Sequence, residues 1–218
     1  EELTGGVATL MKKNKVTVLA GRGELAAPEK VTVHGAAGAT TVGAAHVCLA
    51  MGSAPIALPF LPFDGERVLS STEALELARV PKHLVVIGAG AVGLELGSVW
   101  RRLGAEVTII EMLAGIAPFA DKQMAGSLQR ALAEQGLAFR LESRVTAGKV
   151  TGRGVGLTVE SAKGEVEEMV CDLVLVAVGR RPVTDNAGLE AAGVRLDERG
   201  RVAVDESELD RNFTAAKT

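Results

Sequence analysis

A run of β-branched residues leads directly into three closely spaced glycines, and this feature constrains the fold more than any other. The run is His83-Leu-Val-Val-Ile, followed by Gly-Ala-Gly-Ala-Val-Gly at positions 88–93. A helix-prone segment comes next, and a second apolar run, 107–110, ends on Glu111. Strand, glycine turn, helix, strand and terminal acid in this order are typical of a dinucleotide-binding βαβ unit.

Each glycine of the turn has a physical reason. Gly88 lets the strand turn sharply, Gly90 lets a pyrophosphate approach the backbone, and Gly93 lets the helix lie close to the strand. The phosphates would face unpaired N–H groups and the partial positive charge at the helix N-terminus. The predicted cofactor contacts in the turn are Gly88, Ala89, Gly90, Ala91, Val92, Gly93 and Leu94.

Glu111 is placed to select the nucleotide. A carboxylate at the end of the second strand accepts hydrogen bonds from the adenosine ribose hydroxyls and would repel a 2′-phosphate. No basic residue follows within 112–117, so the pattern favours NAD over NADP. We therefore expect Glu111→Arg to shift preference toward NADPH. Both FAD and NAD use this motif, and its position behind another β-rich unit favours the nicotinamide.

The central part of the chain predicts an α/β fold with a Rossmann-like parallel sheet. The βαβαβ unit is expected at 83–88, 91–103, 105–111, 121–135 and 137–141, with Asp121, Gly104 and Gly136 as caps. The segments 144–146, 154–160 and 165–170 alternate and predict an inserted antiparallel meander. The fully apolar segment 172–178 should return to the centre of the sheet. Ser70 to Glu73 predicts a helix N-cap before a short helix at 74–78.

The flanking parts predict a second, β-rich unit. A helix is expected at 4–14, a three-stranded meander at 15–20, 30–34 and 40–43, a fourth strand at 46–50 and a hairpin at 194–204. Three prolines between Pro55 and Pro62 indicate a boundary, because neither a helix nor a central strand tolerates them. The expected domains are residues 1–53, 54–182 (NAD-binding) and 183–218 (a partial return to the first domain), and the family resemblance given below implies that the first and last are parts of an FAD-type domain.

Composition excludes several classes of partner. The net charge is −3 and the basic clusters are short, so a nucleic-acid surface is not expected. No apolar stretch reaches the roughly 18 residues of a membrane span. Cys48 and Cys171 are interpreted as small buried hydrophobic residues, and this usage fits a reducing compartment. The three histidines are interpreted as structural, and no metal ligands are predicted.

The stretch from Gly88 to Glu111 resembles the NAD-binding domain of the dihydrolipoamide dehydrogenases, within the pyridine nucleotide–disulfide oxidoreductases. The run Leu96-Gly-Ser-Val-Trp-Arg-Arg-Leu-Gly104 is characteristic of that group. Further matching segments are 6–15, 179–184 and 188–202, so the resemblance covers about residues 3–205.

The resemblance implies roles for single residues. Glu111 would bind the adenosine ribose, and Val145 would lie at the adenine pocket. Glu95 and Gly179 would lie near the nicotinamide. Gly23, Gly52 and Ser53 match positions that touch FAD, and Met51 replaces a threonine whose hydroxyl lies near the flavin. NAD and FAD are thus the implied cofactors.

The family also implies a reaction. Dihydrolipoamide, carried on a lipoyl domain of a 2-oxoacid dehydrogenase complex, reduces an active-site disulfide, the dithiol reduces FAD, and FAD passes a hydride to NAD⁺. The parent is expected to be a homodimer of the bacterial cytoplasm or the mitochondrial matrix.

Several parts of the family pattern do not occur in this sequence. They are the first FAD glycine motif, the Cys-x4-Cys pair, the C-terminal domain with the catalytic His and Glu, and the flavin-binding Gly-Asp segment expected after residue 205. No catalytic residue is therefore assigned, and we expect a fragment that is inactive by itself. The alternatives are a related flavoprotein disulfide reductase and a non-catalytic dinucleotide-binding module.

Overall fold

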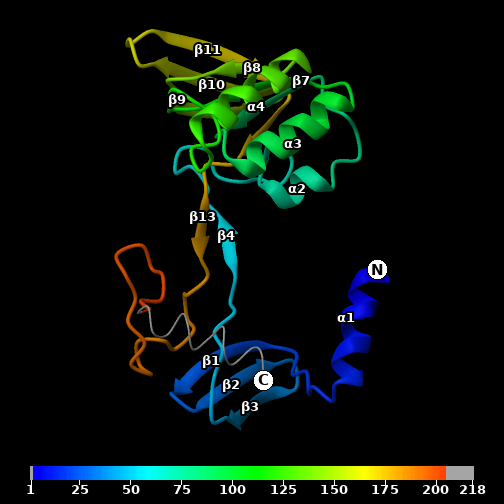
Figure 1. The fold of residues 1–218 in the computed structure, drawn as a ribbon, viewed down its shortest axis with the longest axis vertical. Helices are drawn as coiled ribbons and strands as arrows, with labels where there is room; N and C mark the ends of the chain where they lie inside the picture. The colour runs from blue at the N-terminus through cyan, green and yellow to red at the C-terminus, as the bar shows by residue number, and fades with distance from the viewer. Residues whose placement is uncertain (1, 205–218) are drawn as a thin grey trace. The chain divides into compact units, whose positions relative to one another are not determined.

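The computed structural model describes residues 2–204, and the chain divides into two compact units (Figure 1). Unit 1 is formed by Glu1–Ser53 and Pro182–Thr218, and unit 2 by Ala54–Arg181. The chain passes between the units in two short strands, β4 (Ser53–Pro55) and β13 (Arg180–Pro182), which pair with each other. The segment 206–218, which departs from the family pattern, lies outside the described residues.

Unit 2 is built on a five-stranded parallel sheet with the strand order β5-β12-β6-β7-β8. The strands are β5 (Val68–Leu69), β6 (His83–Ile87), β7 (Glu106–Ile110), β8 (Ala138–Arg140) and β12 (Leu173–Val176). Strand β12 lies between β5 and β6, so the apolar segment near 172–178 does return to the interior of the sheet. Its residues Val174 to Val176 are buried, as expected for a parallel strand covered on both faces.

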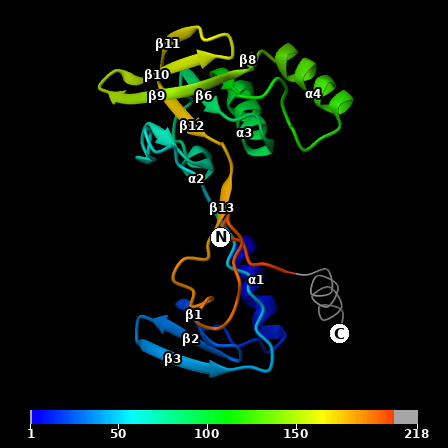
Figure 2. The ribbon, with the colours of Figure 1, turned by 90° about the vertical axis from the view of Figure 1, so that its left-hand side faces the viewer.

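Helices cover one face of this sheet and an antiparallel meander covers the other. Helices α2 (Ser71–Leu75), α3 (Ala91–Arg102) and α4 (Lys122–Glu134) contribute Ala74, Leu94, Trp100 and Leu132 to a cluster with alternate residues of β6 and β7. The remaining alternate residues pack against β10 (Gly154–Ser161), which lies between β9 (Ser143–Thr151) and β11 (Val166–Cys171). Figure 2 shows the meander and α4 on opposite sides of β6. The predicted parallel α/β fold with an inserted meander is confirmed.

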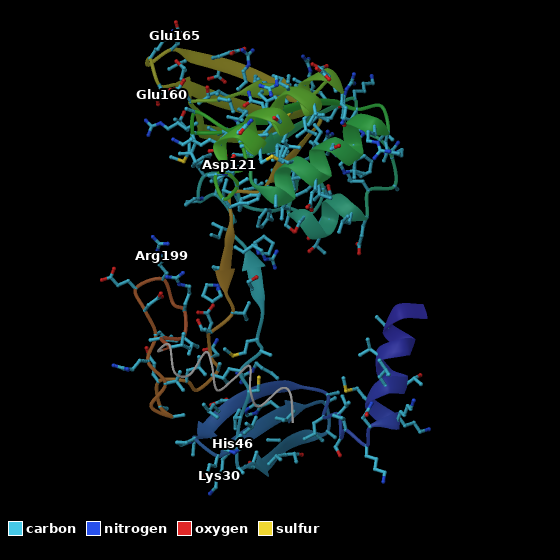
Figure 3. The ribbon with its side chains drawn as sticks, viewed as in Figure 1. Lys30, His46, Asp121, Glu160, Glu165 and Arg199 are labelled. Atoms are coloured by element: carbon cyan, nitrogen blue, oxygen red, sulfur yellow. The ribbon has the colours of Figure 1, made fainter. Side chains whose placement is uncertain are left out.

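The helix ends of unit 2 follow the predicted capping chemistry. Ser70 and Glu73 form a capping box, so α2 begins at Ser71 rather than at 74. The Asp121 carboxylate, labelled in Figure 3, accepts hydrogen bonds from the N–H groups of Gln123 and Met124 at 2.9 and 3.3 Å. Gly104, with φ +111°, follows α3 in a backbone conformation that favours glycine.

Unit 1 contains α1 (Glu2–Lys13) and a three-stranded antiparallel sheet with the order β1-β2-β3. The strands are β1 (Arg22–Ala27), β2 (Lys30–Gly35) and β3 (Gly38–Gly43). The predicted strand at 15–20 is wrong. Pro28-Glu29 forms a tight connection, so β2 pairs with the residues just before it, and Val16, Val18 and Leu19 stay 45–70% exposed.

Three other predictions in unit 1 need correction. Residues 46–50 form no strand among the described residues, because no neighbouring strand there offers them hydrogen bonds. Val47 and Leu49 pack on a cluster around Leu25, and alternation leaves Cys48 exposed rather than buried. The expected hairpin at 194–204 is reduced to one bridge, between Leu196 and Val202.

Candidate functional site

Two glycines of the turn are required by packing within unit 2. Gly88 follows β6 with φ +107°, and a Cβ there would lie 2.5 Å from the carbonyl oxygen of Ala177. Its N–H donates to the carbonyl of Ile110 at 2.8 Å, which joins the ends of β6 and β7. A Cβ on Gly93 would meet the backbone of Gly88 and lie 3.1 Å from Val86 Cγ1. A side chain at Gly88 would push away the segment that follows β12, and a side chain at Gly93 would push α3 away from β6 and the turn.

Gly90 has no such packing reason. It is the N-cap of α3 with φ −77°, a conformation open to any residue, and a Cβ there would meet no atom within 4 Å. The first N–H groups of a helix have no partner within the helix, so those after Gly90 face this open space. An open volume at a helix N-terminus is suited to a phosphate group.

The peptide of Ala89 connects the turn to Glu111. Ala89 is fully buried, and its N–H donates to Glu111 Oε2 at 2.8 Å. The carbonyl of Ala89 accepts from the N–H of Ala117 at 2.9 Å. The other carboxylate oxygen, Glu111 Oε1, accepts from the N–H of Leu113 at 2.9 Å. Glu111 is only 9% exposed, so its carboxylate lies beside the turn at the carboxyl edge of the sheet.

The remaining predicted residues of the turn and of α3 have different surroundings. Ala91 is exposed and Val92 half-buried at the start of the helix, and Glu95 is exposed one turn later. The Leu94 side chain is buried in the helix-side core, and its N–H donates to the carbonyl of Gly90 at 3.0 Å. These contacts describe a core residue, so a cofactor contact by Leu94 stays a prediction.

Val145 and Gly179 lie on two other elements of unit 2, β9 and the segment after β12. Val145 lies on β9 opposite Val159 and packs against the cluster that contains Ile110, the residue before Glu111. Gly179 follows β12 with φ +142°, and its carbonyl accepts from the N–H of Ile56 at 3.1 Å. Since β12 lies next to β6, Gly179 and the glycine turn follow neighbouring strands.

A cavity of about 310 Å³ adjoins the Glu111 loop and was not foreseen from the sequence. Arg144 and Glu160 form an ion pair at its rim, 2.9 Å apart, and Glu160 on β10 is labelled in Figure 3. It is lined by residues of the Glu111 loop, β9 and β10 and of the segments next to these strands, and no motif in the sequence predicts it. Its lining residues are Met112, Glu142, Ser143, Arg144, Glu160, Ser161 and Ala162.

The residues predicted to touch FAD lie in unit 1. Gly23 is exposed on β1, and Met51 is half-buried against the cluster around Leu25. Gly52 has φ +72°, and its carbonyl accepts from the N–H of Val183 at 3.2 Å. Ser53 begins β4 and is exposed. Met51, Gly52 and Ser53 thus lie at the start of β4, where the chain leaves unit 1. Gly23 lies elsewhere in the unit, in the antiparallel sheet.

Residues 2–204 contain neither a membrane-spanning helix nor a cluster of metal ligands. None of the described helices is both long and apolar enough to cross a membrane. In the same residues, no group of three or more His, Cys, Asp or Glu side chains is arranged to hold a metal ion.

Comparison with known proteins gives consistent matches over the whole described chain. It is 48% identical over 203 residues to dihydrolipoyl dehydrogenase 3 of Pseudomonas putida, covering 92% of this chain and 44% of that protein. It is 44% identical over 206 residues to the mitochondrial dihydrolipoyl dehydrogenase of Rattus norvegicus, covering 93% and 40%. Among solved structures, LpdA from Mycobacterium tuberculosis matches with a TM-score of 0.84 at 29% identity, covering 94% of this chain and 45% of LpdA.

The chain thus spans less than half the length of these relatives. The model of one family, pyridine nucleotide-disulphide oxidoreductase, matches residues 1–209, nearly the entire sequence. Together with the glycine turn, the parallel sheet and the inserted meander, this match establishes that the chain belongs to the pyridine nucleotide-disulphide oxidoreductase family.

Proposed function

We propose that this chain is the NAD-binding part of a flavoprotein that oxidises dihydrolipoamide with NAD⁺ through FAD and a redox disulfide. The proposal rests on two features that occur together, the open space beside Gly90 and the carboxylate of Glu111. Open space lies beside Gly90 at the N-terminus of α3, and the Glu111 carboxylate lies at the end of the next strand. A pyrophosphate and an adenosine ribose require these two features at this spacing.

Different residues would bind different parts of NAD. The N–H groups after Gly90 would hold the pyrophosphate, and Glu111 would accept hydrogen bonds from the ribose hydroxyls. Val145 would contact the adenine, while Glu95 and Gly179 would lie toward the nicotinamide. Bound NAD⁺ would supply the hydride acceptor. In unit 1, Gly23, Met51, Gly52 and Ser53 would touch part of FAD.

The relatives support a proposal for the partners and location of the whole protein. The relatives in the comparison include bacterial and mitochondrial dihydrolipoyl dehydrogenases. We infer a homodimer that meets dihydrolipoamide on a lipoyl domain of a 2-oxoacid dehydrogenase complex, in the bacterial cytoplasm or the mitochondrial matrix. The two cysteines of this chain are 123 positions apart and form no Cys-x4-Cys pair. We therefore expect the 218-residue chain to bind NADH without dihydrolipoamide:NAD⁺ turnover.

The test is a fluorescence titration of NADH against three proteins. The unchanged chain should give saturable binding, and Gly90→Ala should weaken it at least tenfold, because the methyl group fills the space left for the pyrophosphate. Gly126→Ala is the matched control. Gly126 lies in α4, and a Cβ there also meets no atom within 4 Å. The control should therefore fold and bind as the unchanged chain does.

Three results would contradict the proposal. Absence of saturable NADH binding by the unchanged chain would favour a non-catalytic family member. Equal binding by Gly90→Ala and Gly126→Ala would show that the space beside Gly90 is not used. Turnover of dihydrolipoamide by the 218-residue chain would overturn its assignment as the NAD-binding part alone.

A further inference from the structure

The geometry points to a second role for Glu111: its carboxylate positions the glycine turn before any cofactor binds. The proposed ribose contact uses Glu111 as a ligand for the nucleotide. The observed contacts use it as an acceptor for two backbone amides of the protein itself. This inference rests on the proposed NAD site, and it makes Glu111 a positioning residue within that site.

The peptide of Ala89 is held on both sides. Its N–H donates to Glu111 Oε2 at 2.8 Å, and its carbonyl accepts from the N–H of Ala117 at 2.9 Å. Ala89 is fully buried, so water offers these groups no replacement partner. A buried amide that loses its acceptor is destabilised, and such a loss favours rearrangement of the turn.

The same two contacts close the segment 111–117 into a loop. At the start of the loop, the Glu111 carboxylate accepts from the N–H of Ala89. At its end, the N–H of Ala117 donates to the carbonyl of Ala89. Inside this loop, Leu113 donates to Glu111 Oε1 and accepts from the N–H of Glu142. Displacing the carboxylate therefore removes one of the two contacts between this loop and Ala89, and one contact of Leu113 within the loop.

This arrangement divides the backbone donors of the turn. The N–H of Ala89 is engaged by Glu111, so the donors left for a pyrophosphate are the N–H groups of Gly90 and of the residues that follow it in α3. A carboxylate offers roughly four acceptor positions, and two of them serve Ala89 and Leu113. The other two suffice for the two ribose hydroxyls. Glu111 can thus hold the turn and the ribose at once.

Amide hydrogen exchange in the cofactor-free protein tests the positioning role directly. Glu111→Ala should speed exchange at Ala89 and Leu113 at least tenfold. Glu111→Gln keeps the side-chain volume but has one carbonyl oxygen, so one of the two amides should lose protection. Glu106→Gln removes an exposed acid from the other end of β7 and should leave both amides unchanged.

A binding experiment separates positioning from ribose contact. The probe is an NADH analogue whose adenosine is 2′,3′-dideoxy and so has no hydroxyl for Glu111. If Glu111 positions the turn, Glu111→Ala should still weaken binding of this analogue at least tenfold. A residue that only contacted the ribose would give the same affinity for the analogue before and after the substitution.

The outcomes distinguish this inference from the proposed function. Unchanged exchange at Ala89 and Leu113 in Glu111→Ala overturns the positioning role, even where NADH binds. An equal rise in exchange across β6, β7 and α3 also overturns it, because that indicates a general loss of stability. If the unchanged chain binds no NADH, the proposed function fails, and exchange in the free protein still decides the positioning role.

Discussion

The indole Nε1 of Trp100 donates a hydrogen bond to the carbonyl oxygen of Ala74 at 3.0 Å, which ties α3 to α2. Trp100 is 7% exposed and Ala74 is 1% exposed, so the bond lies inside the helix-side core. The capping box of Ser70 and Glu73 stabilises the first turn of α2. The indole hydrogen bond then holds Ala74, the residue after Glu73. Trp100 therefore combines apolar packing with a specific tether for a helix of only five residues.

We expect Trp100→Phe to lower the free energy of unfolding by about 1–3 kcal/mol, because the Ala74 carbonyl loses its donor in a buried place. The measurement is urea denaturation followed by circular dichroism, since the chain has only one tryptophan for fluorescence. Val99→Ala is the matched control: Val99 lies on the same helix, is 46% exposed and should change stability by less than about 0.5 kcal/mol. Equal effects of the two substitutions would contradict the tether.

The Asp64 carboxylate gives unit 2 a defined response to acid. One oxygen accepts from the N–H groups of Glu66, Arg67 and Val68 at 2.7–2.9 Å. Burial acts to raise the pKa of Asp64, but these donors together hold it below its ordinary value of 3.8. The charged form is thus favoured by folding. Its contribution is present above pH 3.8 and is lost as the pH falls through the lower, folded-state pKa.

Asp64→Asn isolates this contribution, because the amide oxygen can still accept from the backbone while the side chain no longer titrates. We expect the unfolding midpoint to fall less steeply below about pH 4 in the variant than in the unchanged protein. Urea denaturation at a series of pH values provides the comparison. Parallel curves for the two proteins would show that Asp64 titrates alike in the folded and unfolded chains.

The two cysteines should react differently with thiol reagents, because Cys171 is buried and Cys48 is exposed. Burial raises the pKa of the Cys171 thiol to about 12, and its Sγ lies 3.6 Å from the carbonyl of Val155. Cys48 is exposed. Since the thiolate is the reactive form, a thiol reagent at pH 8 should modify one cysteine in the native protein and two in denaturant. Mass spectrometry should locate the native adduct on Cys48, and native labelling of Cys171 would contradict its burial.

Local chemistry explains which parts of the fold were predictable. The glycine turn, the Asp121 cap and the Ser70–Glu73 capping box depend on residues a few positions apart, so the sequence alone indicates them. The strand 22–27 was missed because its pairing with β2 follows from a tight turn at 28–29, and the β-branched residues at 16–19 form a stronger apolar pattern. The alternation at 46–50 was likewise hidden by a continuous apolar run.

The residues of the candidate site could be proposed from the sequence, but the hydrogen bonds that connect them could not. Gly88, Gly90, Gly93 and Glu111 follow a known spacing, whereas the hydrogen bond from Ala117 to Ala89 joins positions without any motif. Ala117 adopts φ +46°, which is uncommon for a residue other than glycine and is imposed by the surrounding loop. An alanine at position 117 gives no sign in the sequence of a positive φ.

The amide contacts of Glu111 change what an arginine substitution should do. A role limited to the ribose predicts that Glu111→Arg exchanges NADH preference for NADPH preference. The arginine, however, has no acceptor for the N–H groups of Ala89 and Leu113. We therefore expect Glu111→Arg to weaken NADH binding at least tenfold and to bind NADPH less tightly than the unchanged protein binds NADH.

The matched control for that substitution is Met112→Arg. Met112 is 71% exposed, so this variant adds the same charge at the neighbouring position while both amide acceptors remain. It should retain NADH binding within a few-fold in the same fluorescence titration. If Glu111→Arg instead binds NADPH as tightly as the unchanged protein binds NADH, the turn does not need the carboxylate. Cofactor choice would then depend on the ribose contact alone.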